Sequence, residues 1–146
     1  MKTILIFVTS VLMSWSSFAA DTTPASPTVV DTEMQSARAQ IAKKDWAAAV
    51  ATLEPYTKAN AKSADGFNLL GYSYRNLKRY DESLVAYKQA LTLDPKHKGA
   101  HEYIGLAYIQ MRQPAKAGEH LAALDKLCTF TCGEYRDLKK ALEAYK

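Results

Sequence analysis

Chemically reactive residues are scarce in this chain of 146 residues, which has two cysteines and three histidines. No Ser-His-Asp set, glycine-rich phosphate loop or pair of catalytic carboxylates stands out from the pattern of charges. A metal site would need more ligands than Cys128, Cys132 and His120 supply, and no second paired motif provides them. The sequence therefore predicts a protein that is not an enzyme and has no cofactor or metal.

A large excess of charge is also missing. The chain has 19 Lys and Arg residues against 15 Asp and Glu residues, a formal net charge of +4. Nucleic-acid binding would require a basic stripe or patch, which the sequence does not show. We expect no nucleic-acid partner and only a slight preference for acidic partners.

The first residues have the pattern of a secretory signal peptide. Lys2 gives a positive start, residues 4–15 are mostly apolar, and Ser17 and Ala19 are small residues where signal peptidase requires them. We expect residues 1–19 to be removed by a cut after Ala19, which exports the protein to the periplasm. The apolar run is short and interrupted by polar residues, so stable membrane insertion through a retained anchor is the less favoured alternative.

Residues 20–30 separate this leader from the domain expected at residues 31–146. They hold two prolines and four Ser or Thr residues and show no periodicity, which predicts a flexible tether. Thr32 and Gln35 have capping-box spacing, so a helix is expected to begin at Thr32. A second helix is expected from Trp46 to about residue 58, with Pro55 kinking it or ending it early.

Residues 64–97 carry aromatic and small residues at fixed offsets. The order corresponds to W-x2-L-G-x2-Y, A-x3-F and P, filled here by Phe67, Leu70, Gly71, Tyr74, Ser83, Tyr87, Ala90 and Pro95. This pattern resembles the tetratricopeptide repeat. The offsets return 34 residues away on each side, which predicts repeats at 30–63, 64–97 and 98–131. The resemblance implies an all-α protein, an α-solenoid of three helix pairs that binds a protein or peptide partner.

Two features predict how this solenoid is held together. Gly71 and Gly105 should each let the facing helix of their own pair approach closely. After the third repeat, residues 132–146 form an amphipathic stripe expected to be a capping helix, with Thr131 and Glu134 as its capping box. The apolar side of the stripe consists of Tyr135, Leu138, Leu142 and Tyr145.

Cys128 and Cys132 are the only cysteines, and export would bring them to an oxidising compartment. An even pair is usually a disulfide there. A bridge over so short a loop would mainly fix the angle between the cap and the solenoid. A thiol-redox accessory protein is the alternative, although the C-x-x-C spacing and a βαβ scaffold are both missing.

His97 and His101 are four residues apart, which on a helix would place both on one face as a chelate. However, His97 lies at a repeat junction after Pro95, and His101 occupies the slot that Phe67 fills one repeat earlier. We therefore expect packing roles for both.

The resemblance also implies where a partner binds. In similar proteins the first helix of each repeat lines a concave groove, and the residues between the packing slots point inward. These are Arg38, Asn68, Leu69, Tyr72, Arg75, Asn76, Glu102, Tyr103, Leu106 and Gln110, with Met34, Gln35 and Ile109 beside them. Tyr72, Arg75 and Tyr103 are the strongest candidates, because Tyr and Arg are frequent binding hot spots.

The expected occupant is a peptide or helix of an envelope protein. A self-associating structural module is the remaining alternative, since solenoid edges can stack, and we expect a monomer or a weak homo-oligomer. Family members that grip chaperone carboxylates use a basic and amide clamp. Here Met34, Leu69, Gly99 and Tyr103 occupy four of the five clamp positions, with only Arg38 as a donor, so that clamp is not expected.

Overall fold

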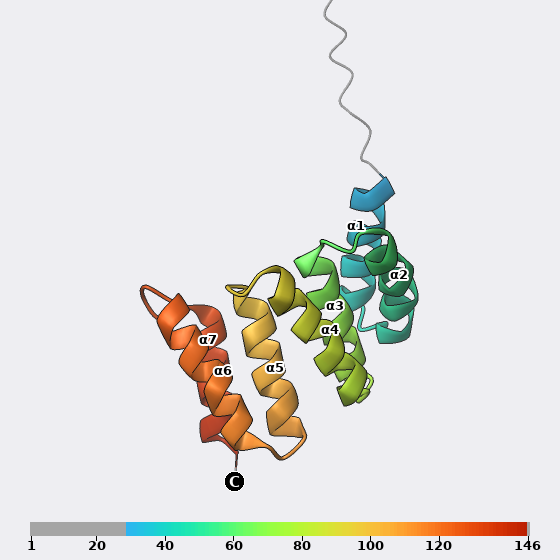
Figure 1. Cartoon of the computed structure of the whole chain (residues 1–146). Helices are drawn as coiled ribbons and strands as arrows, with labels where there is room; N and C mark the ends of the chain where they lie inside the picture. The colour runs from blue at the N-terminus through green and yellow to red at the C-terminus, as the bar shows by residue number, and fades with distance from the viewer. Residues whose placement is uncertain (1–28, 146) are drawn as a thin grey trace, which may run out of the picture.

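The computed structural model describes residues 29–145, so the expected signal peptide and nearly all of the expected tether lie outside the described residues. The described part contains seven helices and no strand (Figure 1). This confirms the all-α solenoid of three helix pairs followed by a seventh helix. The helices are α1 Val29–Ala42, α2 Trp46–Ala59, α3 Ala64–Asn76, α4 Tyr80–Leu93, α5 Lys98–Gln110, α6 Pro114–Leu127 and α7 Gly133–Glu143.

The turns inside the three helix pairs have the same backbone geometry. Lys44, Lys78 and Arg112 have left-handed φ angles of 59°, 62° and 59°. In the central turn the amides of Lys78 and Arg79 donate to carbonyls in the last turn of α3, both at 2.9 Å. These bonds form a Schellman motif, which satisfies carbonyls that a helix end leaves open. The repetition of this turn shows that the 34-residue period holds in the backbone as well as in the packing slots.

The central pair is held together by the close approach that the sequence predicts at Gly71. A Cβ atom on Gly71 would lie 2.6 Å from Cδ1 of Tyr87, so only glycine fits between the two helices. The Ser83 hydroxyl donates to the Gly71 carbonyl at 2.8 Å. Tyr87 and Ser83 are both fully buried, and the small residues therefore set the distance between α3 and α4.

Gly105 has a different neighbour from the one expected. A Cβ atom there would lie 2.5 Å from Cδ2 of Leu138, which belongs to α7 and not to the pair partner α6. The expectation that Gly105 faces its own pair partner is therefore wrong. The reason is that α7 packs against α5 as well as against α6, which brings Leu138 to Gly105. Leu138 is fully buried, as a capping residue should be.

Two expectations for the first repeat are corrected. Helix α1 begins at Val29, so neither the end of the tether at residue 30 nor the helix start at Thr32 is right. No glycine or proline lies between Val29 and Thr32 to stop the helix there. Helix α2 continues through Pro55 to Ala59, so it does not end early. Burial of Tyr56 and Thr57 anchors its last turn and offsets the hydrogen bond that Pro55 cannot donate.

The connection to the capping helix contains the expected disulfide between Cys128 and Cys132. Cys128 is the C-cap of α6 and Cys132 is the N-cap of α7, so the bridge links two helix ends directly. The expected capping box of Thr131 and Glu134 is wrong, because the N-cap is Cys132 and no side chain caps this helix. The bridge fixes Cys132 at the helix start, one residue after Thr131.

The packing order of the helices gives the solenoid its curvature. Helices α1, α3, α5 and α7 touch in sequence, whereas α2, α4 and α6 do not touch one another within the described part. Because the odd-numbered helices approach more closely, their outer surface is the concave face of the array. None of the described helices is both long enough and apolar enough to cross a bilayer.

Candidate binding surface

Three aromatic side chains from different helices meet on this concave side. We call Trp46 of α2, Tyr72 of α3 and Tyr103 of α5, together with Arg75, the aromatic cluster. The ring centroids of Trp46 and Tyr72 are 5.6 Å apart, and those of Tyr72 and Tyr103 are 4.9 Å apart. The cluster therefore spans all three helix pairs with one continuous row of rings.

Arg75 lies over two of these rings. Its guanidinium carbon is 5.3 Å from the Tyr72 centroid and 5.7 Å from the Tyr103 centroid. Its Nη1 donates to Oε1 of Gln110 at 3.4 Å, and its Nε has no hydrogen-bond partner among the described residues. Arg75 forms no ion pair with a described carboxylate within 4.0 Å. The cluster thus presents a positive charge that the ring faces hold in place.

Carboxylates lie beside the cluster on the side of α7. Glu102 is half-buried, and its burial, with the charges of Asp137 and Glu134, raises its pKa to about 7. The positive charge of Arg75 acts in the opposite direction. Burial also raises the pKa of Tyr103. A basic group of a partner placed here would relieve the repulsion among the three carboxylates.

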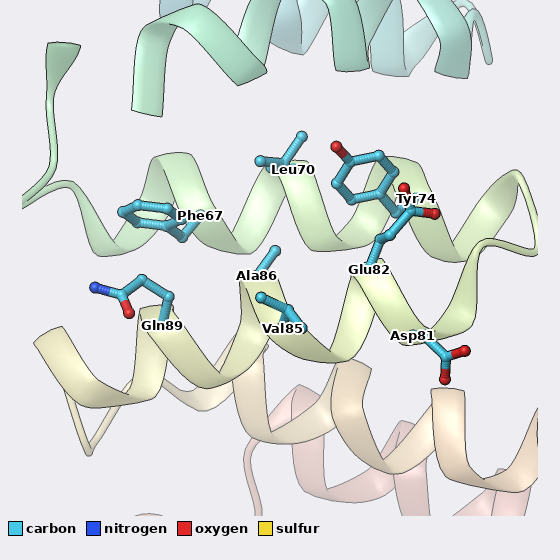
Figure 2. Close-up of a pocket in the computed structure, with 8 residues that line it drawn as sticks. All are labelled: Phe67, Leu70, Tyr74, Asp81, Glu82, Val85, Ala86 and Gln89. Atoms are coloured by element: carbon cyan, nitrogen blue, oxygen red, sulfur yellow. The ribbon is translucent and has the colours of Figure 1, made fainter. Parts of the chain in front are cut away.

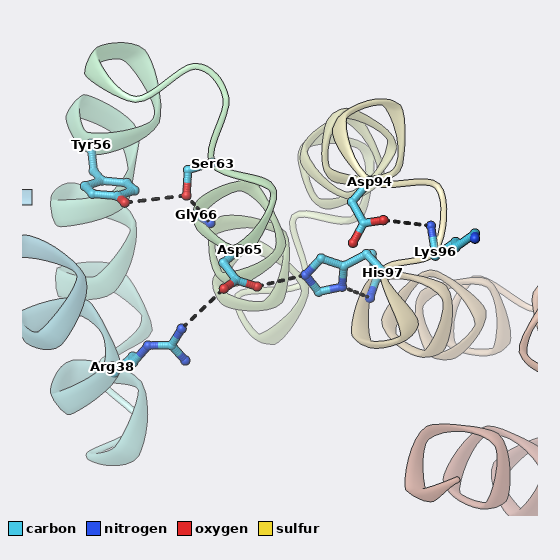
Figure 3. A network of polar contacts seen from close by, with 9 residues as sticks. Arg38, Tyr56, Ser63, Asp65, Gly66, Asp94, Lys96 and His97 are labelled. Carbon is cyan, nitrogen blue, oxygen red and sulfur yellow. Dashed lines mark hydrogen bonds and ion pairs between the residues drawn. The ribbon is translucent and has the colours of Figure 1, made fainter. Parts of the chain in front are cut away.

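Arg38 of α1 belongs to a separate row of polar contacts, which continues with Asp65 and His97 at the N-terminal ends of α3 and α5 (Figure 3). Asp65 lies 3.9 Å from Arg38 and 3.0 Å from Nε2 of His97. The other ring nitrogen, Nδ1 of His97, accepts from the Ala100 amide at 3.1 Å and caps α5. Nε2 of His97 therefore carries the proton and donates to Asp65 when the ring is neutral. These contacts use His97 for capping, so the alternative of a chelate with His101 has no support.

The other predicted groove residues are bound into the solenoid to different degrees. Asn68 is buried, with 7% of its surface exposed, and Leu69 packs against the first hydrophobic core. Asn76 donates to the Tyr72 carbonyl at 2.8 Å, and Leu106 is half-buried. The structure brings together Tyr72, Arg75, Tyr103 and Gln110, with Glu102 beside them, and adds Trp46, which the packing slots did not indicate.

A pocket of about 500 Å³ lies elsewhere on the central repeat (Figure 2). Phe67 and Leu70 line it from α3, on a different side of that helix from Tyr72 and Arg75. The sequence pattern did not indicate it, because the residues that line it from α3, Phe67, Leu70 and Tyr74, occupy packing slots. One feature of the sequence does point to the pocket. Phe67 stands where the motif has Trp, and the Phe side chain fills less volume than the Trp side chain. The lining is formed by Phe67, Leu70, Tyr74, Asp81, Glu82, Val85, Ala86 and Gln89.

Comparisons with known proteins agree with this architecture. The sequence profile of the Tetratricopeptide repeat family matches residues 64–97, the bounds predicted for the second repeat. The solved structure of a mutant form of MamA is 26% identical with a TM-score of 0.65, and the match covers 72% of this chain and 77% of that chain. No curated protein sequence is significantly similar to the chain.

Two further solved structures share the fold at lower identity. The TPR2B domain of yeast Sti1, in its complex with pHsp70, has a TM-score of 0.73 at 19% identity and covers 78% of this chain and 93% of that chain. The Yersinia enterocolitica type III secretion translocator chaperone SycD has a TM-score of 0.73 at 17% identity, covering 82% and 93% respectively.

These findings show a repeat and a fold that the chain shares with known proteins. The chain contains a tetratricopeptide repeat at residues 64–97 and has the helical-repeat fold of tetratricopeptide-repeat proteins. Such domains are interaction modules without catalysis, and they generally mediate contacts between proteins.

Proposed function

We propose that the chain is a non-catalytic adaptor, exported to the periplasm, that binds a peptide or helix of an envelope protein on its concave face. The observation that carries this proposal is the aromatic cluster, in which Arg75 is stacked on Tyr72 and Tyr103 without a described ion-pair partner. Trp, Tyr and Arg are the residues that most often dominate binding energy. Their side chains here are ordered before binding, so little entropy would be lost.

The charges around the cluster suggest the chemistry of the partner. An apolar or aromatic side chain would stack on Tyr72 and Tyr103, and a neighbouring Lys or Arg would face Glu102 and the α7 carboxylates. Because the pKa of Glu102 is raised to about 7, a bound cation would lower it and release a proton near neutral pH. Binding should therefore be tighter at pH 8 than at pH 6.

Export is supported by the leader pattern of residues 1–19 and by the disulfide, a bond typical of oxidising compartments. The intact mass of the protein recovered from a periplasmic extract tests it. We expect a chain that begins at Ala20. A full-length chain retained in the cytoplasm would contradict the proposal.

Crosslinking in the periplasm followed by pull-down tests the binding function. The triple variant Tyr72→Ala, Arg75→Ala and Tyr103→Ala should lose partners that the wild type captures. Val85→Ser is the matched control, since Val85 is 70% exposed and lines the pocket on the central repeat. The control should keep those partners. A partner list that the triple variant leaves unchanged, with its helical content intact, would refute binding at the aromatic cluster.

We do not assign the partners of the structural neighbours to this chain. The pHsp70 complex belongs to yeast Sti1, and the basic clamp that would suit a chaperone carboxylate is missing here. The thiol-redox accessory remains the alternative from another class. It predicts that replacing both cysteines abolishes activity in the cell while leaving partner capture intact.

A further inference from the structure

Two histidines from different helices are in direct contact in the third repeat. Nδ1 of His101, in α5, lies 3.1 Å from Nδ1 of His120, in α6. Nε2 of His101 lies 3.1 Å from the carbonyl oxygen of Pro95. The ring of Tyr108 stacks on His120 with a centroid distance of 5.9 Å. Both imidazoles are therefore held by neighbours on more than one side.

The protons of this pair can be assigned from its contacts. The Pro95 carbonyl can only accept, so Nε2 of His101 carries a hydrogen. A neutral His101 then has a lone pair on Nδ1, and His120 must donate to it from its own Nδ1. Each ring can thus present one nitrogen without a proton, which is the form of imidazole that binds metals.

We propose that His101 and His120 form a two-imidazole chelate for Cu²⁺ or Zn²⁺, bound through Nδ1 of both rings. Two nitrogens bound at about 2.0–2.1 Å with an angle of about 90–110° lie about 2.9–3.4 Å apart, and the observed 3.1 Å falls within this range. To bind, His120 moves its proton from Nδ1 to Nε2, so no proton is released. Imidazole is a preferred ligand of both ions, and Cu²⁺ should bind more tightly.

The Pro95 carbonyl gives His101 the support that metal-binding histidines usually have. A ligand histidine normally donates its other N–H to a carbonyl or carboxylate, which fixes the tautomer and the ring orientation. No group of three or more His, Cys, Asp or Glu residues suited to a metal occurs in the part of the chain that the structure describes. The chain would thus supply two ligands, and water or a partner would complete the coordination. This inference is independent of the proposed binding function.

Calorimetric titration of the purified chain, without a histidine tag, tests the chelate with Cu²⁺ and with Zn²⁺ alone. His101→Gln and His120→Gln should each weaken binding at least about tenfold. His97→Gln is the control, because His97 caps α5 and contacts Asp65, and its affinity should equal that of the wild type. Absence of measurable binding by the wild type, or wild-type affinity in the two chelate variants, would overturn the proposal.

Nitrogen NMR of the wild type gives a second readout that does not depend on how the variants fold. Zn²⁺ should shift the Nδ1 resonances of His101 and His120 and leave those of His97 in place. Unshifted resonances at saturating Zn²⁺ would overturn the site even if a variant were unfolded. Thermal melts in EDTA show whether each variant is folded before its affinity is read.

Discussion

A methyl group on Gly71 would lie 2.6 Å from the Tyr87 ring, closer than side-chain carbons approach in real proteins. Gly71 and Tyr87 belong to the two helices of the central repeat, and Tyr87 is fully buried. The buried ring could move away only by displacing its neighbours, because protein cores are close-packed and transmit such strain. The distance between α3 and α4 therefore depends on the absence of a side chain at residue 71.

Gly71→Ala should destabilise the protein by about 1–3 kcal/mol, the usual cost of overpacking a core. Gly118→Ala is the control, because Gly118 also lies in a helix and no atom lies within 4 Å of the position that a Cβ would take there. At that position Ala has a better helix propensity than Gly, so the substitution should stabilise the protein by about 0.5–1 kcal/mol. Urea denaturation of both variants measures the difference. Equal stability of the two variants would contradict the close-approach argument.

Leu138→Ala should remove the contact that seals the last repeat. Leu138 is fully buried against Gly105, and a buried Leu→Ala change costs about 2–5 kcal/mol. Lys140→Ala, on the exposed side of α7, should change stability by less than about 0.5 kcal/mol. Chemical denaturation compares the two. If the Leu138 variant were as stable as the Lys140 variant, α7 would not be a structural cap.

Replacing both cysteines by serine should lower the free energy of unfolding by about 2 kcal/mol. This is the value that loop-closure entropy gives for a bridge over only a few residues. Alkylation followed by mass spectrometry should label Cys128 and Cys132 only after reduction. Labelling without reductant would refute the disulfide. Unchanged activity of the double variant in the cell would assign the bridge to structure, because the thiol-redox alternative predicts that this activity is lost.

The stability of the protein should depend on pH through two groups with opposite signs. Burial lowers the pKa of His120 to about 4, so the unfolded chain binds more protons between pH 6.5 and 4, and stability falls as pH falls through this window. The pKa of Glu102 is raised to about 7, so the folded chain holds the extra proton, and stability falls as pH rises from 4.5 to 7.

Single variants separate these two contributions. In metal-free buffer, His120→Gln should flatten the loss of stability on the acidic side, and Glu102→Gln should flatten the loss toward neutral pH. Denaturation curves at several pH values measure both effects. A variant whose pH profile runs parallel to that of the wild type would show that its group does not titrate with the assigned shift.

The repeat register was predictable because the slots around Gly71 and Tyr87 recur every 34 residues. Contacts within one helix pair require small or aromatic residues at fixed spacings, and these spacings can be read from the sequence. Contacts outside the pattern were not predictable: Leu138 fills the space beside Gly105, and Tyr56 and Thr57 hold the end of α2 beyond Pro55. These contacts depend on how distant segments meet.

Only part of the candidate site was predictable from the sequence. The resemblance pointed to Tyr72, Arg75 and Tyr103, which the structure brings into contact. It did not indicate Trp46, because this residue lies on a second helix and not on the one expected to line the groove. The contact of His101 with His120 was also not expected, since it joins two different helices, and His120 lies outside the motif.

Site-specific photo-crosslinking in the periplasm tests the central claim most directly. A photoreactive residue at Gln110, next to Arg75, and one at Gln89, at the pocket on the central repeat, make a matched pair of exposed glutamine positions. Binding on the concave face predicts a partner crosslinked from Gln110 and not from Gln89. A partner crosslinked from Gln89 alone would contradict the account.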